Sequence, residues 1–337
     1  MISSKKIQTI LNKAVDNKKI FGATICLSKD EVTSCFASGN MSPDRIYFTA
    51  SVTKLYTASI ILILKDTGKL MLDDKITNIL PKEVMAGIHV WKGKEYSDSV
   101  TIRHLLSNTS GIADYFEQKK KSGRSIMDEL ISGADIKMEF NDMISIAKSM
   151  MPKFPPGKKG KAFYSDTGFQ LLGKIIEIKT GMTLQKAYKT YIFDPLNLKR
   201  SYLYSDISDG APAAIYYKNN ILWMPKMMAS FGADGGLVAT AEENMVFLKA
   251  FFEGKLFSIK NFNEMKSWNR IFFPFKYGMA LALFKFPGTY ELIGHPGATG
   301  SFAYYCPKKK TYITGTINQV ARPGLPYKLI MKILKTV

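Results

Sequence analysis

The spacing of hydrophobic and polar residues changes along the chain and predicts its elements. Near the start, apolar residues recur at helical spacing, which predicts an amphipathic helix: Ile7, Ile10, Leu11 and Ala14. Residues 21–39, FGATICLSKDEVTSCFASG, hold two β-rich runs around a polar turn and predict an antiparallel hairpin. Residues 51–68, SVTKLYTASIILILKDTG, are apolar nearly all round and end at Gly68. This segment is expected to be a core helix with Ser51 at its N-terminus.

The middle of the chain is rich in helical patterns, whereas strand patterns return late. The helical patterns are TIRHLLSNTSG, IMDELISG, NDMISIAKSM and DTGFQLLGKIIEIKTG; the strand patterns are LVAT, TYELIGH, SFAYYCP and TYITGTIN. Residues 324–337 predict an amphipathic closing helix. Strands at both ends of the chain imply one sheet completed by both termini.

We therefore expect a mixed α/β (α+β) fold, a central antiparallel sheet flanked by helices with a helical subdomain inserted. Residues 1–337 are expected to form one unit. Its α/β subdomain would comprise 1–67 and 234–337, and its helical subdomain 68–233.

The composition points to a globular protein and leaves its partners open. The 337 residues are 46% hydrophobic, enough for a substantial core. The formal net charge of +19 allows weak association with anionic surfaces. The lysine runs are short and lack interleaved aromatics, so no nucleic-acid partner is expected. No apolar run approaches the roughly 20 residues of a membrane span, and the N-terminal segment has no signal-peptide pattern.

Cys26, Cys35 and Cys306 show no CxxC pair and lie in strand-like segments. They are interpreted as buried free thiols, without a disulfide framework or zinc site. That interpretation suits a reducing compartment, so the sequence as written is expected to be cytoplasmic. A chain that has lost an export signal would look the same and would be periplasmic or extracellular.

The candidate chemistry begins with Ser51 and Lys54. A serine hydroxyl needs a nearby base, and the SxxK spacing places the lysine amine one helical turn away on the same face. Ser3/Lys6 and Ser145/Lys148 share this spacing. Only Ser51 opens a core helix, whose N-terminal amides can stabilise negative charge. On this segment alone, Ser51 could equally be a helix cap and Lys54 a surface lysine.

The order of three motifs resembles the serine penicillin-recognising family, in its branch of class C β-lactamases, DD-peptidases and family VIII-type esterases. SVTK is the first motif, YSD at Tyr164 to Asp166 matches Tyr-x-Asn, and HPG at His295 to Gly297 matches the Lys/His-x-Gly triad. The resemblance covers nearly the whole chain and implies the β-lactamase/transpeptidase-like fold. No cofactor is expected, and no metal site, because His89 and His104 have no carboxylate or cysteine partner at metal-ligand spacing.

The resemblance also implies roles for individual residues. Ser51 would be acylated, while Lys54 and Tyr164 share the proton transfers; which of the two is the base stays open. The backbone amides of Ser51 and Ala298 would form an oxyanion hole, with Gly297 allowing close approach. His295 would line the acyl-binding strand and contact Tyr164.

Two positions depart from the family pattern. Asp166 replaces an amide that donates a hydrogen bond with a carboxylate that only accepts when ionised. His295 stands where many relatives have a lysine that holds the substrate carboxylate. Both changes favour a neutral or cationic substrate, with Asp166 as an ammonium anchor.

The expected function is a serine acyl hydrolase that acts on an ester, amide or peptide-like small molecule. An esterase or D-amino-acid peptidase/amidase is favoured over a penicillinase. The alternatives are a class C type β-lactamase or DD-carboxypeptidase, and a non-catalytic penicillin-binding-like sensor.

Overall fold

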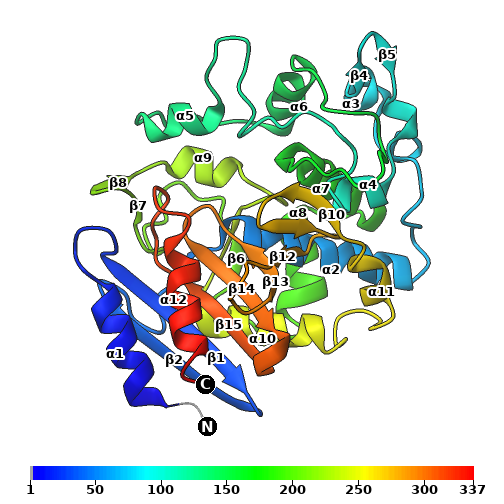
Figure 1. Cartoon of the computed structure of the whole chain (residues 1–337). Helices are drawn as coiled ribbons and strands as arrows, with labels where there is room; N and C mark the ends of the chain where they lie inside the picture. The colour runs from blue at the N-terminus through cyan, green and yellow to red at the C-terminus, as the bar shows by residue number, and fades with distance from the viewer. Residues whose placement is uncertain (1–2) are drawn as a thin grey trace.

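The computed structural model describes residues 3–337, and a large antiparallel sheet forms its centre (Figure 1). The eight strands lie in the order β10-β11-β12-β13-β14-β15-β1-β2. Their bounds are β1 Gly22–Lys29, β2 Val32–Gly39, β10 Asn269–Phe272, β11 Phe275–Tyr277, β12 Ala282–Phe284, β13 Leu292–Pro296, β14 Ser301–Cys306 and β15 Thr311–Thr316. Since β1 pairs with β15, residues from both ends of the chain complete one sheet, as the sequence predicts.

Within residues 3–337, the remaining strands form three small sheets outside the central one. Their bounds are β3 Tyr47–Phe48, β4 Val90–Trp91, β5 Lys94–Glu95, β6 Tyr202–Leu203, β7 Ile215–Tyr217, β8 Asn220–Leu222 and β9 Leu237–Ala239. β9 pairs with both β3 and β6, so it links the segment before Ser51 to the middle of the chain.

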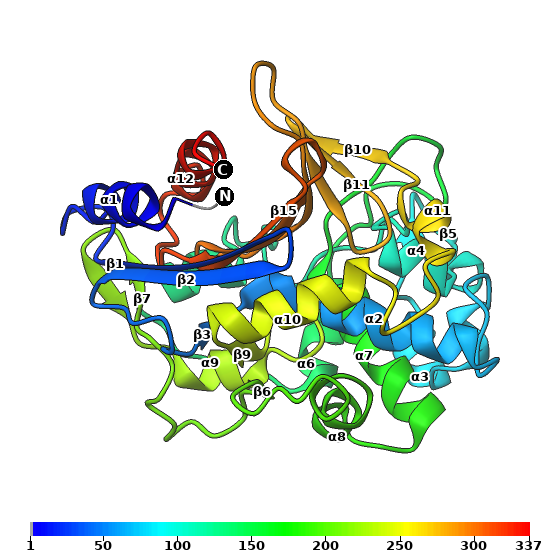
Figure 2. The same ribbon diagram turned by 90° about the horizontal axis from the view of Figure 1, so that it is seen from below.

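Helices cover both faces of the sheet. The helix bounds are α1 Ser4–Ala14, α2 Thr53–Asp66, α3 Lys82–Met85, α4 Ile102–Leu106, α5 Ile126–Ile131, α6 Phe140–Lys148, α7 Asp166–Thr180, α8 Leu184–Tyr188, α9 Pro225–Ser230, α10 Ala241–Phe252, α11 Asn261–Met265 and α12 Leu325–Leu334. Figure 2 shows α1 and α12 on one face of the sheet, and α2 and α10 on the other. The helices between α2 and α9 gather to one side (Figure 1).

The predicted α+β fold class is confirmed, and most predicted elements lie where the patterns placed them. The core helix is α2, in which Lys54 and Leu55 are fully buried together with most of the apolar side chains. Ser51 lies in a 3₁₀ turn, Ala50–Val52, that leads directly into α2. None of the helices is long and apolar enough to cross a membrane, within residues 3–337.

The interpretation of all three cysteines as free thiols is wrong. Cys26 on β1 and Cys35 on β2 are direct cross-strand partners, and a disulfide joins them. The hairpin brings their Cα atoms to 4.0 Å from each other. Because the sequence analysis considered only CxxC and framework spacings, it overlooked that the predicted hairpin pairs these two positions. Cys306 is buried and free, as expected.

Candidate active site

Ser51 lies in a tightly anchored turn at the junction of sheet and helices. The preceding residue, Ala50, has φ +46°, a left-handed conformation that is strained for a residue with a Cβ and that clusters at functional sites. The amide of Thr49 donates to Leu237 O at 2.9 Å. The Thr49 carbonyl accepts a hydrogen bond from Ser301 Oγ at 2.7 Å. These contacts fix the Ser51 turn against β9 and β14.

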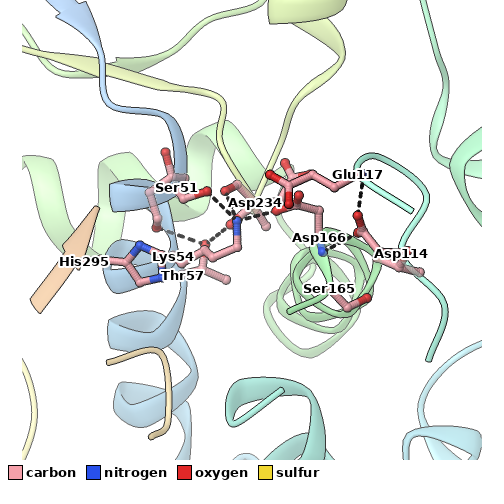
Figure 3. A network of polar contacts seen from close by, with 12 residues as sticks. Ser51, Lys54, Thr57, Asp114, Glu117, Ser165, Asp166, Asp234 and His295 are labelled. Atoms are coloured by element: carbon pink, nitrogen blue, oxygen red, sulfur yellow. Dashed lines mark hydrogen bonds and ion pairs between the residues drawn. The ribbon is translucent and has the colours of Figure 1, made fainter. Parts of the chain in front are cut away.

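Lys54 is completely buried and points at Ser51. Its Nζ donates to Ser51 Oγ at 3.0 Å, to Asp166 Oδ1 at 2.5 Å and to the backbone carbonyl of Asp234 at 2.6 Å (Figure 3). Burial lowers the pKa of Lys54, but the carboxylates of Asp166 and Asp234 outweigh it, and the net pKa is raised. Lys54 is therefore a cation in the resting state.

Asp234 is a member of the site that sequence reasoning missed. It lies on the loop before β9, is 1% exposed, and accepts a hydrogen bond from Tyr115 Oη at 2.7 Å. Burial and the neighbouring Asp166 charge raise the pKa of Asp234 to about 6. The glycine-rich segment around Asp234 predicts a turn into a strand, and no local sequence pattern indicated that this carboxylate belongs to the site.

Two further acidic residues, Asp114 and Glu117, come from the loop after α4 and were also missed (Figure 3). Asp114 is buried and accepts from the amides of Asp166 at 2.7 Å and of Glu117 at 2.6 Å. Burial and the Asp166 charge raise the pKa of Asp114 well above its usual range. This carboxyl fixes the start of α7 and hence the position of Asp166.

Glu117 is exposed at the edge of the site. The pKa of Glu117 is raised to about 7, because the walls of the cleft partly desolvate its carboxyl and because the negative charge of Asp166 disfavours its ionisation. Its protonation therefore changes near neutral pH.

Tyr164 is held between two rings close to Lys54. Its ring packs edge-on to Tyr277 at 5.9 Å and lies 6.1 Å from the His295 ring. Lys54 Nζ lies 5.0 Å from the centre of the Tyr164 ring. Burial and the Asp166 charge raise the pKa of Tyr164 well above its usual value, while a hydrogen bond with Ser51 lowers it. The phenol is therefore protonated in the resting state.

His295 on β13 is buried and neutral. Its Nδ1 donates to Pro296 O at 2.7 Å, so Nε2 is the nitrogen that accepts from Tyr277 Oη at 3.0 Å. Burial and the Lys54 charge lower the pKa of His295 to about 3. His295 thus supplies no positive charge to a substrate at neutral pH.

Gly297 and Ala298 follow β13 and approach the Ser51 turn closely. A Cβ on Gly297 would lie 2.0 Å from Ser301 Oγ and 2.6 Å from Thr49 O, so only glycine fits there. Ala298 lines both cavities that flank Ser51. The structure thus brings together all seven residues singled out from the sequence: Ser51, Lys54, Tyr164, Asp166, His295, Gly297 and Ala298.

Two cavities meet at Ser51 and Ala298. The smaller has a volume of about 50 Å³ and is mainly apolar; Phe116, Met228 and Phe231 are among its walls, and Asp166 reaches into it. The larger is a groove of about 900 Å³ that runs past Tyr164 and His295 towards α12. Within residues 3–337, no group of His, Cys, Asp and Glu side chains is placed to hold a metal ion.

The acid residues around Lys54 have a chemical consequence. A serine, a buried lysine and a tyrosine at these distances can exchange protons during acyl transfer. The extra carboxylates hold Lys54 in its charged form, so the site needs a proton to leave before Lys54 can act as a base.

Comparison with known proteins places this geometry in a family. The family model described as Beta-lactamase matches residues 7–335. Penicillin-binding protein 4 of Amycolatopsis lactamdurans is 30% identical over 162 residues, which cover 48% of this chain and 37% of that protein.

Two solved structures share the fold over almost the whole chain. A D-stereospecific amidohydrolase from Streptomyces sp. has a TM-score of 0.78 and 25% identity, with 94% of each chain covered. The D-amino acid amidase from Ochrobactrum anthropi SV3 has a TM-score of 0.81 and 23% identity, with 98% of this chain and 100% of the other covered.

The curated relatives are longer than this chain. The matched regions cover 37%, 51% and 42% of the first three of them, so the chain spans about half of their length or less. The family model, in contrast, accounts for nearly all of the described residues. The chain belongs to the Beta-lactamase family.

Proposed function

We propose that this protein is a serine acyl hydrolase that works through an acyl-enzyme on Ser51. The observation that carries the proposal is the hydrogen bond of 3.0 Å from the buried Lys54 Nζ to Ser51 Oγ, at the meeting point of two cavities. Burying the charge of a lysine costs free energy. A lysine with only a structural role in the first turn of a core helix would gain nothing from burial beside a half-exposed serine.

The proposed reaction has two stages. Ser51 Oγ attacks the substrate carbonyl carbon, and its proton passes to Lys54 in the amine form or to Tyr164 in the phenolate form. The backbone amides of Ser51 and Ala298 stabilise the oxyanion. The C–N or C–O bond then breaks, and the leaving group takes up the proton. A water molecule then attacks the acyl-enzyme carbonyl and loses a proton to the same groups. The bond between Ser51 Oγ and the acyl carbon breaks, Ser51 Oγ takes up that proton, and the acid product leaves.

The charges near Ser51 favour a substrate with an ammonium group close to the scissile bond. The carboxylates of Asp166 and Glu117 line the two cavities on either side of Ser51. Asp166 Oδ1 already accepts from Lys54, so we assign the role of ammonium anchor to Glu117 rather than to Asp166. A neutral His295 offers no partner to a substrate carboxylate, which disfavours a β-lactamase or DD-carboxypeptidase.

An amino-acid amide or ester fits these requirements. The similarity to a D-stereospecific amidohydrolase, at 25% identity over 94% of both chains, supports the amide of a D-amino acid. The apolar cavity beside Ser51, of about 50 Å³, would receive a small side chain such as the methyl group of D-alanine.

The catalytic assignment is tested with a fluorophosphonate probe. We expect wild-type protein to be labelled once and Ser51→Ala not at all, with Ser145→Ala as the matched control because Ser145 belongs to the other SxxK pattern within the described helices. Equal labelling of Ser51→Ala and wild type would reject Ser51 as nucleophile. Absence of labelling in the wild type would favour a non-catalytic binding protein.

The substrate assignment is tested by steady-state rates on D-alanine amide, its L-enantiomer, 4-nitrophenyl butyrate and nitrocefin. We expect the D-amide to be turned over faster than the L-amide, and nitrocefin slowest. The Glu117→Gln variant should lose activity on the amide but keep its activity on the neutral butyrate ester. Faster turnover of nitrocefin than of the other substrates would overturn the assignment.

We further propose that residues 1–337 act as one catalytic unit, with Ser51 between the α/β part (1–67 and 234–337) and the helical part (68–233). The Cys26–Cys35 disulfide supports an oxidising compartment rather than the cytoplasm. Alkylation under denaturing conditions, with and without prior reduction, would test this. We expect one reactive thiol in the unreduced protein and three in the reduced protein.

A further inference from the structure

The groove beside Ser51 has an aromatic wall that no step of the proposed reaction uses. The wall begins on β10 and β11, where the rings of Phe272 and Phe275 are 5.1 Å apart. Phe275 lies 5.4 Å from Phe284 on β12, which stacks on Tyr327 of α12 at 4.5 Å. All four side chains line the groove. They give it a continuous apolar surface, suited to a chain of methylene groups or apolar side chains.

The far part of the groove carries positive charge. The groove is lined by Lys328, Lys332 and Lys335. Lys328 and Lys332 lie one turn apart on the same face of α12, and Lys335 follows directly after this helix. All three are exposed. The groove is lined both by Ser51, in the turn that leads into α2, and by these lysines. Figure 2 shows α12 and α2 on opposite faces of the sheet.

The two ends of the groove therefore carry opposite charges. Glu117 lies near Ser51, and the charges lining the groove on α12 are lysines. An elongated molecule with an apolar body would be oriented by this arrangement, because its anionic end is attracted to α12 and its ammonium end to Glu117.

We infer that the groove binds the apolar portion of the substrate, a chain that ends in a carboxylate. The chain lies on the aromatic wall, and its carboxylate lies at Lys328 and Lys332. This inference rests on the proposed function for the position of the scissile bond, and it adds the class of the group attached there. With Glu117 at the other end, the substrate is zwitterionic overall, as an unblocked peptide-like chain is.

Binding can be measured without turnover. Isothermal titration calorimetry of the wild-type protein with decanoate and with decanamide compares two ligands of equal length that differ in the charge of one end. We expect decanoate to bind about fivefold more tightly, because exposed ion pairs with lysines add only a small attraction each. The Lys328→Gln/Lys332→Gln variant should bind the two ligands equally.

The matched control is Lys69→Gln/Lys82→Gln, which removes the same charge from two exposed lysines that do not line the groove. It should keep the preference for decanoate. Phe286→Ala removes an exposed ring from the groove and should weaken both ligands alike, by about threefold. Equal binding of the two ligands to wild type, or equal loss in both double variants, would overturn the inference.

A kinetic comparison links the groove to the reaction. If D-alanine amide is hydrolysed, D-alanyl-8-aminooctanoate should be cleaved with a kcat/KM about fivefold above that of its carboxamide-ended analogue. Unlike Lys69→Gln/Lys82→Gln, Lys328→Gln/Lys332→Gln should remove this difference. A preference that persists in that variant contradicts the inference. Failure to hydrolyse any amide, with the calorimetric preference intact, would reject the proposed substrate and leave the groove assignment standing.

Discussion

Replacement of Asp166 by asparagine should shift the pH dependence of the reaction. Asp166 Oδ1 lies 2.5 Å from Lys54 Nζ, and both side chains are almost fully buried. The pair keeps the pKa of Lys54 above its ordinary 10.5. If the amine form of Lys54 is the base, kcat/KM of the wild type must rise about tenfold per pH unit up to pH 10 without reaching a plateau.

The size of the shift follows from the geometry. At an effective permittivity of about 20, two unit charges 2.5 Å apart attract by about 6 to 7 kcal/mol, which equals about 5 pH units. Asparagine retains an oxygen that accepts from Lys54, and the Asp234 carbonyl at 2.6 Å stays in place. Opposite charges at such distances commonly shift a pKa by about 1 to 3 units. We therefore expect the alkaline limb of Asp166→Asn to lie about 2 units below that of the wild type.

The assay is kcat/KM for 4-nitrophenyl butyrate between pH 6 and 10, corrected for spontaneous hydrolysis. Below the plateau, the variant should be about 100-fold faster than the wild type. The loss of the buried pair should cost about 3 to 5 kcal/mol of stability, measured by urea unfolding at pH 7. Asp98→Asn is the matched control, because it removes an exposed carboxylate paired with Lys75 at 2.9 Å. It should leave the profile unchanged.

A folded Asp166→Asn variant whose limb stays at the wild-type position would refute the assignment of Lys54 as base. A limb that moves to higher pH would refute the electrostatic argument itself. If activity is lost at every pH while fluorophosphonate labelling survives, Asp166 acts on the leaving group and not on Lys54.

Three further changes test other parts of the site. Gly297→Ala should reduce kcat by about 100-fold, because its Cβ would meet Thr49 O and push the Ala298 amide away from Ser51, whereas Gly210→Ala, which meets nothing within 4 Å, should be neutral. Glu117→Gln should lower kcat/KM for the fixed-charge ester 4-nitrophenyl 4-(trimethylammonio)butanoate about fivefold at pH 8.5 and hardly at pH 5.5. The reason is that the Glu117 carboxyl ionises as the pH rises through its pKa of about 7. An equal loss at both pH values would contradict an ammonium anchor. Cys35→Ser should lower the free energy of unfolding by about 2 to 3 kcal/mol in urea, from the 9-residue separation that the disulfide closes, and a reductant should then have no further effect.

The local pattern predicted the nucleophile but not its surroundings. Ser51 and Lys54 could be found because both lie on one short segment whose period is visible in the sequence. Their carboxylate neighbours come from separate loops, with Asp234 180 residues away from Lys54. No single segment contains the information that these side chains converge, because convergence depends on how α2, α7 and the loop before β9 pack.

The fold shows the same division. The β1–β2 hairpin and the helices α1, α2, α7 and α12 have short-range periods, and these elements were predicted. Strands β10 to β12 were missed because they are short and a proline, Pro274, interrupts their apolar residues. This segment carries Phe272, Phe275 and Phe284, so the aromatic groove could not be expected before the strands were known.

Asp166 illustrates why a motif residue has to be read with its neighbours. In the sequence, an acid in place of an amide indicates a change in what the substrate presents. In the structure its carboxylate faces Lys54, so the first effect of the replacement is on the protonation of the base. A site that holds its lysine as a cation must work at a higher pH, or must lower that pKa when a cationic substrate displaces water beside Glu117 and Asp166. The second route predicts that cationic substrates lower the alkaline limb of kcat relative to that of kcat/KM, whereas neutral esters leave the two limbs together.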